Sequence, residues 1–85
     1  MTTQTIKMYG TTWCGDCRRA KMVFDAFNIP YDYTDLGEDA EALAYVKSVN
    51  DGKQIVPTIV FPDGDILVEP SNNELGKKLE RYQSG

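Results

Sequence analysis

The chain has 85 residues and a formal net charge of -4, because its 13 acidic residues outnumber its 9 basic ones. This balance argues against a nucleic-acid backbone or an anionic membrane as the main partner, because both carry negative charge. Hydrophobic residues make up 41% of the sequence, enough for a packed core, yet no apolar stretch approaches the length of a membrane-spanning helix. Residues 1–5 lack the charged and apolar regions of a signal peptide. We therefore expect one domain over residues 1–85 that folds alone, stays in the cytoplasm and is monomeric.

Residue periodicity predicts the first strand and the first helix. Residues 5–9 alternate polar and apolar side chains, as a half-buried strand does, and residues 10–12 form the loop that follows. A helix is expected from Cys14 to about Asn28, since asparagine can cap a helix end and Pro30 cannot continue it. The inward face of this helix should carry Cys17, Ala20, Val23, Phe24 and Phe27.

The middle of the chain predicts a strand, a helix and a hairpin. Residues 31–35 form the second strand, and the acidic residues at 35–39 begin a second helix that ends near residues 50–52. Residues 58–61 and 66–68 are apolar strands joined by a turn that contains proline and glycine. These last two strands should therefore pair as an antiparallel hairpin.

A capping box opens the last predicted helix. Ser71 stands before Glu74 at the spacing of such a box, and the helix should run to about Tyr82 with Gly76 as a mild weakness. The element order is then βαβαββα. Strands joined by a crossover helix run parallel and hairpin strands run antiparallel, so this order predicts an α/β fold with a mixed four-stranded sheet flanked by helices.

Cys14 and Cys17 form a Cys-x-x-Cys pair where the first predicted strand gives way to a helix. Free backbone N–H groups and the helix dipole stabilise an anion there, so Cys14 can be a thiolate at neutral pH, and Cys17 lies one turn further on. In a reducing compartment such a pair is more often catalytic or metal-binding than structural. The chain has no histidine, so a zinc site would need carboxylate ligands. We therefore expect a redox pair and no metal.

Trp13 and Asp16 flank the thiols, and each has two interpretations. Trp13 either forms an exposed rim that shields the thiolate and contacts a ligand, or packs against the last helix. Asp16 either opposes a neighbouring thiolate, unless Arg18, Arg19 and Lys21 offset its charge, or is an ordinary aspartate at a helix start. Both residues are candidates for substrate binding.

Three segments resemble the glutaredoxin branch of the thioredoxin superfamily, and the resemblance extends over nearly the whole chain. They are residues 14–17, residues 55–58, which are similar to the family's segment with a cis proline, and residues 68–75 around the start of the last helix. The resemblance implies a thioredoxin-like fold and a thiol-disulfide oxidoreductase. It also implies no bound cofactor and a low-molecular-weight thiol, mycothiol or glutathione, as co-substrate.

Within that branch the chain looks most like the mycoredoxins, which act on mycothiol mixed disulfides. Residues 11–15, 48–50 and 69–71 carry this similarity. Glutaredoxins that use glutathione commonly have Pro-Tyr between the cysteines and Gly-Gly before the last helix, whereas this chain has Gly15-Asp16 and Pro70-Ser71. The resemblance therefore favours mycothiol over glutathione.

Further substrate contacts are expected from two places. A cis bond before Pro57 would leave Val56 extended beside the thiols, with backbone groups free to pair with a peptide-like substrate. The alternative is an ordinary trans proline at the start of a strand. Ser71, Asn72 and Asn73 either present helix N-terminal amides to a substrate carboxylate or serve only as a cap.

Three functional hypotheses follow. The first is an oxidoreductase that reduces mixed disulfides between proteins and a small thiol, with Cys14 as nucleophile and Cys17 as resolving thiol. The second is a protein disulfide reductase that a flavoprotein reductase reduces directly, resembling the redoxins that serve ribonucleotide reductase. The third, with the least support, is an iron–sulfur cluster carrier in which two chains bridge the cluster. We favour the first.

Overall fold

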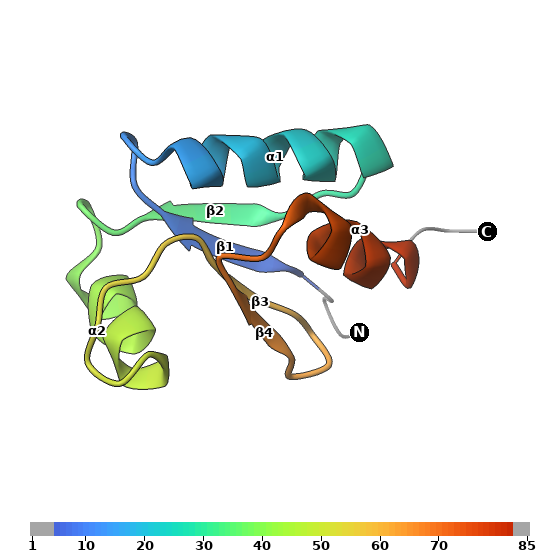
Figure 1. Cartoon of the computed structure of the whole chain (residues 1–85). Helices are drawn as coiled ribbons and strands as arrows, with labels where there is room; N and C mark the ends of the chain where they lie inside the picture. Colours follow the sequence, from blue (N-terminus) through green and yellow to red (C-terminus); the bar gives the residue numbers. More distant parts are fainter. Residues whose placement is uncertain (1–4, 83–85) are drawn as a thin grey trace.

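The computed structural model describes residues 5–82, which contain strands and helices in the predicted order (Figure 1). The strands are β1 (Lys7–Gly10), β2 (Asp32–Asp35), β3 (Thr58–Val60) and β4 (Ile66–Val68). The helices are α1 (Gly15–Phe27), α2 (Ala40–Val49) and α3 (Asn72–Glu80). Residues 1–4, part of the segment expected to lack a signal peptide, lie outside the described residues. Between residues 5 and 82, no helix combines the length and apolar character needed to cross a bilayer.

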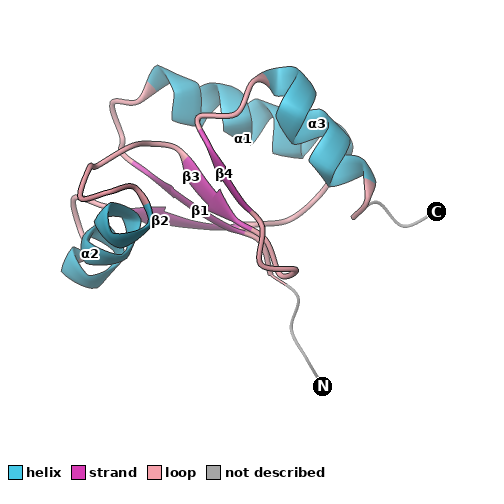
Figure 2. Cartoon of the chain, turned by 60° about the horizontal axis from the view of Figure 1, so that its bottom comes forward, coloured by secondary structure: helices cyan, strands magenta, loops and turns pink. Residues whose placement is uncertain are grey.

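The strands form one mixed sheet in the order β2-β1-β3-β4. β1 and β2 run parallel, whereas β1 with β3 and β3 with β4 are antiparallel pairs. α1 and α3 cover one face of the sheet, and α2 lies on the other (Figure 2). The crossover through α1 produces the parallel pair, and the hairpin produces the last antiparallel one. The predicted topology is therefore confirmed.

Four strand boundaries differ from the prediction by one or two residues, at both ends of β1, at the start of β2 and at the end of β3. β1 begins at Lys7 rather than at Thr5, because the register with β2 and β3 starts at Lys7. β3 ends at Val60, because the N–H of Phe61 donates to the carbonyl of Asp65 at 2.9 Å and so closes the hairpin turn.

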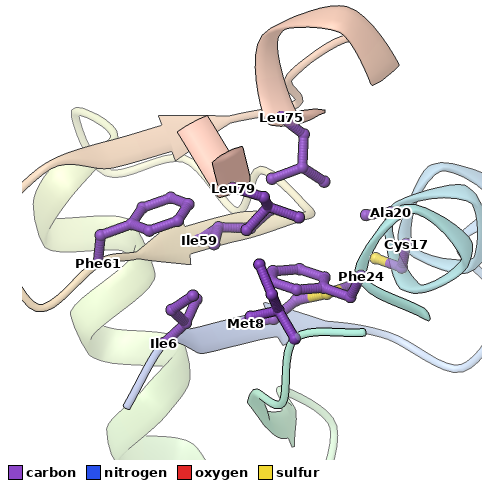
Figure 3. Close-up of a cluster of buried hydrophobic side chains, with 10 residues drawn as sticks. Ile6, Met8, Cys17, Ala20, Phe24, Ile59, Phe61, Leu75 and Leu79 are labelled. Atoms are coloured by element: carbon purple, nitrogen blue, oxygen red, sulfur yellow. The ribbon is translucent and has the colours of Figure 1, made fainter. Parts of the chain in front are cut away.

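The main core lies between the sheet and the helices α1 and α3 (Figure 3). Cys17, Ala20 and Phe24 of α1 are buried as predicted, and Val23 and Phe27 pack at the edge of the same cluster. Its other buried members come from the sheet, from α3 and from the end of α1: Ile6, Met8, Ile29, Ile59, Phe61, Leu75 and Leu79. One thiol of the pair thus belongs to the core itself.

Gly76 lies where α3 packs on α1. A Cβ atom added there would stand 3.3 Å from Cζ of Phe27, closer than most real contacts of this kind. Glycine at this position, expected from the sequence to weaken the helix, allows α1 and α3 to approach each other closely.

A smaller apolar cluster joins α2 to the opposite face of the sheet. It consists of Leu36, Ala42 and Val46, with Tyr9 and Val56 among the partly buried side chains around it. Val56 also packs against the main core. The segment before Pro57 is therefore held by apolar contacts with both clusters.

Candidate active site

Cys14 is the residue that caps the N-terminus of α1. Its backbone is extended, with φ of -90° and ψ of 115°, and its sulfur accepts the N–H of Cys17 at 3.1 Å. The carbonyl of Cys14 accepts the N–H of Arg18 at 3.3 Å, so the helix begins directly after it. The Cys14 side chain is half-buried, which leaves part of it open to solvent. A free helix-start amide therefore points at this sulfur, as the sequence predicts.

Cys17 is buried under the first turn of α1, with an exposed fraction of 2%. Burial first, and the hydrogen bond with Cys14 second, raise the pKa of the Cys17 thiol to about 12. Cys17 is therefore a neutral thiol at physiological pH. The two cysteine side chains interact but differ in access, because Cys14 is half-buried and Cys17 is buried.

Gly10 at the end of β1 makes room for the Cys17 sulfur. A Cβ atom at this position would lie 2.6 Å from Sγ of Cys17 and 3.1 Å from a ring carbon of Tyr33. Sequence reasoning treated Gly10 only as part of a loop. Its signal was available, since a glycine at a strand end often marks a close approach of another group.

The peptide bond between Val56 and Pro57 is cis, as the resemblance implies, and the trans alternative is wrong. The carbonyl oxygen of Val56 lies 4.0 Å from Sγ of Cys14. Pro57 is buried, whereas Val56 is half-buried and faces the groove beside the thiols. The backbone of Val56 is thereby brought next to the sulfur that would attack a substrate.

A short network of polar groups anchors the segment before Pro57. The hydroxyl of Thr58, which is fully buried, donates to the carbonyl of Ile55 at 2.7 Å. The amide of Asn50 donates to the Thr58 oxygen at 3.2 Å and to the carbonyl of Val46 at 2.8 Å. The sequence predicts Asn50 as part of the end of α2 and of the segment similar to mycoredoxins, but it does not predict these hydrogen bonds, because they form only once the turn before β3 is in place.

Trp13 is 77% exposed and therefore forms a rim rather than packing against α3. It lines a groove of about 470 Å³ together with Gln54, Ile55, Val56 and Glu69. It also lines a second groove of about 410 Å³, whose other walls are Thr11, Thr12, Asp35, Leu36, Gly37, Glu38, Leu43 and Gln54. The tryptophan thus stands between two open grooves beside the cysteine pair.

Asp16 makes an ion pair with Arg19 one turn along α1, with 3.2 Å between the carboxylate and the guanidinium. Of the other two cations expected to offset it, Lys21 lies 3.7 Å from the centroid of the Tyr33 ring, and Arg18 is exposed. An acid in the first turn suits the helix dipole, so these contacts account for Asp16 structurally. Its action on the thiolate stays a prediction.

Ser71 begins α3 with the predicted capping box. Its hydroxyl accepts the N–H of Glu74 at 3.1 Å, and the Glu74 carboxylate accepts the N–H of Ser71 at 3.0 Å. Asn72 and Asn73 follow as exposed residues in the first turn. The Ser71 side chain therefore has a structural role, and a contact of these residues with substrate stays a prediction.

Among residues 5–82, no three His, Cys, Asp or Glu side chains gather as a metal site would require.

Known proteins are similar to this sequence along most of its length. Residues 6–67 match the family model named Glutaredoxin. A Mycobacterium tuberculosis protein named as a glutaredoxin is 42% identical over 79 residues, which cover 93% of this chain and 94% of that protein. Mycoredoxin 1 of Corynebacterium glutamicum is 40% identical over 75 residues, which cover 88% of this chain and 92% of the relative.

Solved structures share the fold. The thioredoxin-like protein BC3987 superposes with a TM-score of 0.75 at 25% identity, covering 86% of this chain and 97% of that one. A glutaredoxin from Archaeoglobus fulgidus gives a TM-score of 0.73 at 17% identity, covering 96% of this chain and 89% of that one. The protein is thus a thiol-disulfide oxidoreductase with the thioredoxin fold. More particularly, the chain belongs to the glutaredoxin family, whose members take a low-molecular-weight thiol as co-substrate and carry no bound cofactor.

Proposed function

We propose that the enzyme reduces mixed disulfides between proteins and a low-molecular-weight thiol, with Cys14 as nucleophile and Cys17 as resolving thiol. The small thiol is mycothiol in preference to glutathione. The observation that carries the assignment of roles is the asymmetry of the pair: Cys14 is half-buried at a helix start, whereas Cys17 is 2% exposed and protonated at neutral pH.

The reaction begins when the Cys14 thiolate attacks the small-thiol sulfur of the mixed disulfide. A sulfur–sulfur bond forms between Cys14 and the small thiol, the substrate bond breaks, and the protein thiolate leaves and takes up a proton. A second small thiol then attacks, releasing a symmetrical small-thiol disulfide and regenerating Cys14. In the alternative second step, Cys17 loses its proton, closes a disulfide with Cys14 and releases the small thiol. Either way the substrate gains two electrons.

Substrate binding is proposed to use the groove between Trp13 and Val56. The Val56 backbone beside the Cys14 sulfur offers peptide-like pairing without demanding a particular side-chain sequence. The start of α3 at Ser71, Asn72 and Asn73 is a further candidate for contact with the small thiol.

Two departures from glutathione-using glutaredoxins support mycothiol. Gly15 and Asp16 stand between the cysteines in place of Pro-Tyr, and Pro70 and Ser71 stand before the last helix in place of a Gly-Gly pair. The similarity to a protein named mycoredoxin points the same way. Since small thiols are kept reduced in the cytosol, we propose that the enzyme works there, as a monomer.

The test compares one peptide carried as a mixed disulfide with glutathione or with mycothiol. Wild-type, Cys14→Ser and Cys17→Ser enzymes are assayed with the matching thiol as reductant. We expect faster turnover with mycothiol, no turnover by Cys14→Ser, and retained turnover by Cys17→Ser because a second thiol can resolve the intermediate. Loss of all activity in Cys17→Ser would make resolution by Cys17 obligatory and favour a disulfide reductase fed by a flavoprotein reductase, whereas full activity of Cys14→Ser would contradict the proposal.

A further inference from the structure

The grooves on the two sides of Trp13 carry acidic groups only. Glu69 lines the groove that contains Val56, and Asp35 and Glu38 line the groove on the other side. No lysine or arginine lines either groove within the described residues. A ligand that occupies the grooves beside Trp13, the residue before Cys14, therefore meets negative charge on both sides.

The basic residues of α1 do not cancel this charge at the groove walls. Arg19 is paired with Asp16 at 3.2 Å, and Lys21 stands over the Tyr33 ring at 3.7 Å. Arg19 therefore contacts a residue of α1 and Lys21 contacts a residue of β2, and neither side chain lines a groove. Among the described residues, the charged side chains that line the two grooves are therefore carboxylates.

Glu69 is held in an unusual backbone conformation next to the active site. Its φ is 48°, in the left-handed region that favours glycine, and its N–H donates to the carbonyl of Pro57 at 2.9 Å. Its side chain is exposed. The turn that contains Glu69 is therefore anchored to Pro57. A charged residue occupies a backbone position where glycine would be less strained.

Thr11 offers a neutral polar partner in the second groove. The residue is only 5% exposed, it lines the same groove as Glu38, and its hydroxyl makes no hydrogen bond within residues 5–82. A buried hydroxyl without a partner has unused donor and acceptor capacity. Thr11 therefore adds a neutral side chain, and no cation, to the wall of this groove.

We propose that Glu69 and Glu38 are specificity-determining residues that select small thiols without net negative charge. This inference rests on the proposed function and names the class of its co-substrate. Glutathione carries net negative charge at neutral pH because its carboxylates outnumber its ammonium group. Mycothiol, an acylated cysteine joined to a sugar and an inositol, is uncharged. Repulsion by the groove carboxylates slows the anionic thiol and leaves the neutral one unaffected.

The test measures the second-order rate constant for attack of Cys14 on the two mixed disulfides of one peptide. Glu69→Gln and Glu38→Gln remove one charge each and keep the side-chain shape. Each should raise the rate with the glutathione mixed disulfide roughly two- to fivefold relative to the rate with the mycothiol mixed disulfide, as expected for one exposed charge. The gain should vanish at about 0.5 M salt, where exposed charges are screened.

Glu80→Gln is the matched control, because Glu80 is an exposed residue at the other end of α3. It removes the same charge from the molecule but not from the grooves, and we expect both rates to stay at the wild-type value. Equal rates for wild type and the two groove variants with glutathione would overturn the inference. An equal gain in the Glu80 variant would do so too, since net charge alone would then explain it. If wild type attacked neither mixed disulfide, the proposed function itself would fail, and that result is distinct from both.

Discussion

At the scale of single residues, burial separates two cysteines that are chemically identical in the sequence. Cys14 caps α1 and remains half-open, whereas Cys17 lies in the core with 2% of its surface exposed. The motif predicts the pair and the helix start. It does not predict how deep the second sulfur lies, because that depth depends on Gly10 and on the side chains of distant strands.

The ionisation of Cys17 gives a pH prediction. Because burial raises the pKa of this thiol to about 12, it should remain protonated throughout the neutral and mildly alkaline range. Thiolate absorbance of the reduced Cys14→Ser variant should therefore stay flat up to about pH 10 and rise only above it, since the burial of Cys17 persists. A rise centred near pH 8.5, the usual value for a free thiol, would contradict the burial argument.

Gly10 gives a second prediction at this scale. Gly10→Ala would push a methyl group against the Cys17 sulfur, so we expect a loss of about 1–3 kcal/mol in the free energy of unfolding. Urea denaturation measures this loss. Gly15→Ala is the control, because a Cβ atom there meets nothing within 4 Å. Equal stabilities of the two variants would show that the space beside Cys17 is not tight.

At the scale of elements, the connection from α2 to β3 positions the substrate groove. Sequence patterns predict α2, its acidic N-cap and β3, and Asp39 does cap the helix by accepting the N–H of Ala42 at 3.0 Å. They do not predict the link among Asn50, Thr58 and Ile55, because hydrogen bonds between such positions exist only once the turn has formed.

Thr58→Val tests this link. Valine keeps the shape of threonine but removes the hydroxyl, leaving the Asn50 amide and the Ile55 carbonyl without that partner. We expect unfolding free energy to fall by about 1–3 kcal/mol and kcat/KM for mixed disulfides to fall with it. Thr34→Val is the control variant, because it makes the same chemical change on β2, away from the link among Asn50, Thr58 and Ile55. Wild-type stability and activity in Thr58→Val would mean that apolar contacts alone hold the segment.

The β3–β4 hairpin is tied to α3 by a nearly buried lysine. Lys78 is 8% exposed, and its ammonium lies 2.5 Å from the carboxylates of both Asp63 and Asp65. It also stands 5.2 Å from the centroid of the Phe61 ring. The sequence predicts Asp63 and Asp65 as turn residues but does not predict that they attach the last helix to the hairpin.

This ion cluster predicts a dependence of stability on pH. The hydrogen bond to Lys78 lowers the pKa of Asp63, so this carboxylate stabilises the fold above its ordinary pKa and loses that effect as the pH falls through the lowered value. The bonds to Asp63 and Asp65 raise the pKa of Lys78, whose contribution is complete below its ordinary pKa and is lost as the pH rises through the raised value. The stabilisation thus spans neutral pH.

Lys78→Met measures the effect, because methionine retains much of the apolar stem but not the charge. The gap in unfolding free energy between wild type and variant should be largest near neutral pH and should shrink on acidification to about pH 2, as Asp63 is protonated. A gap that stays constant over this range would assign the lysine's contribution to packing alone.

At the scale of the whole molecule, the order of elements determined most of what the sequence could predict. The crossover through α1, the hairpin and the resemblance around Pro57 together predict the sheet, the edge at which the thiols lie and the cis bond, all of which the structure confirms. The sequence does not predict the grooves beside Trp13. They are assembled from the turns before α1, α2, β3 and α3, which are far apart in the chain.

The account depends most on Cys14 being the reachable nucleophile beside a buried, protonated Cys17, and competitive alkylation tests this directly. The reduced protein is treated with iodoacetamide at pH 7 in the presence of free cysteine, and each site is quantified by mass spectrometry. We predict that Cys14 is labelled faster than free cysteine and that Cys17 is labelled only after unfolding. Labelling of Cys14 no faster than free cysteine, or labelling of Cys17 at a similar rate in the folded protein, would contradict the account.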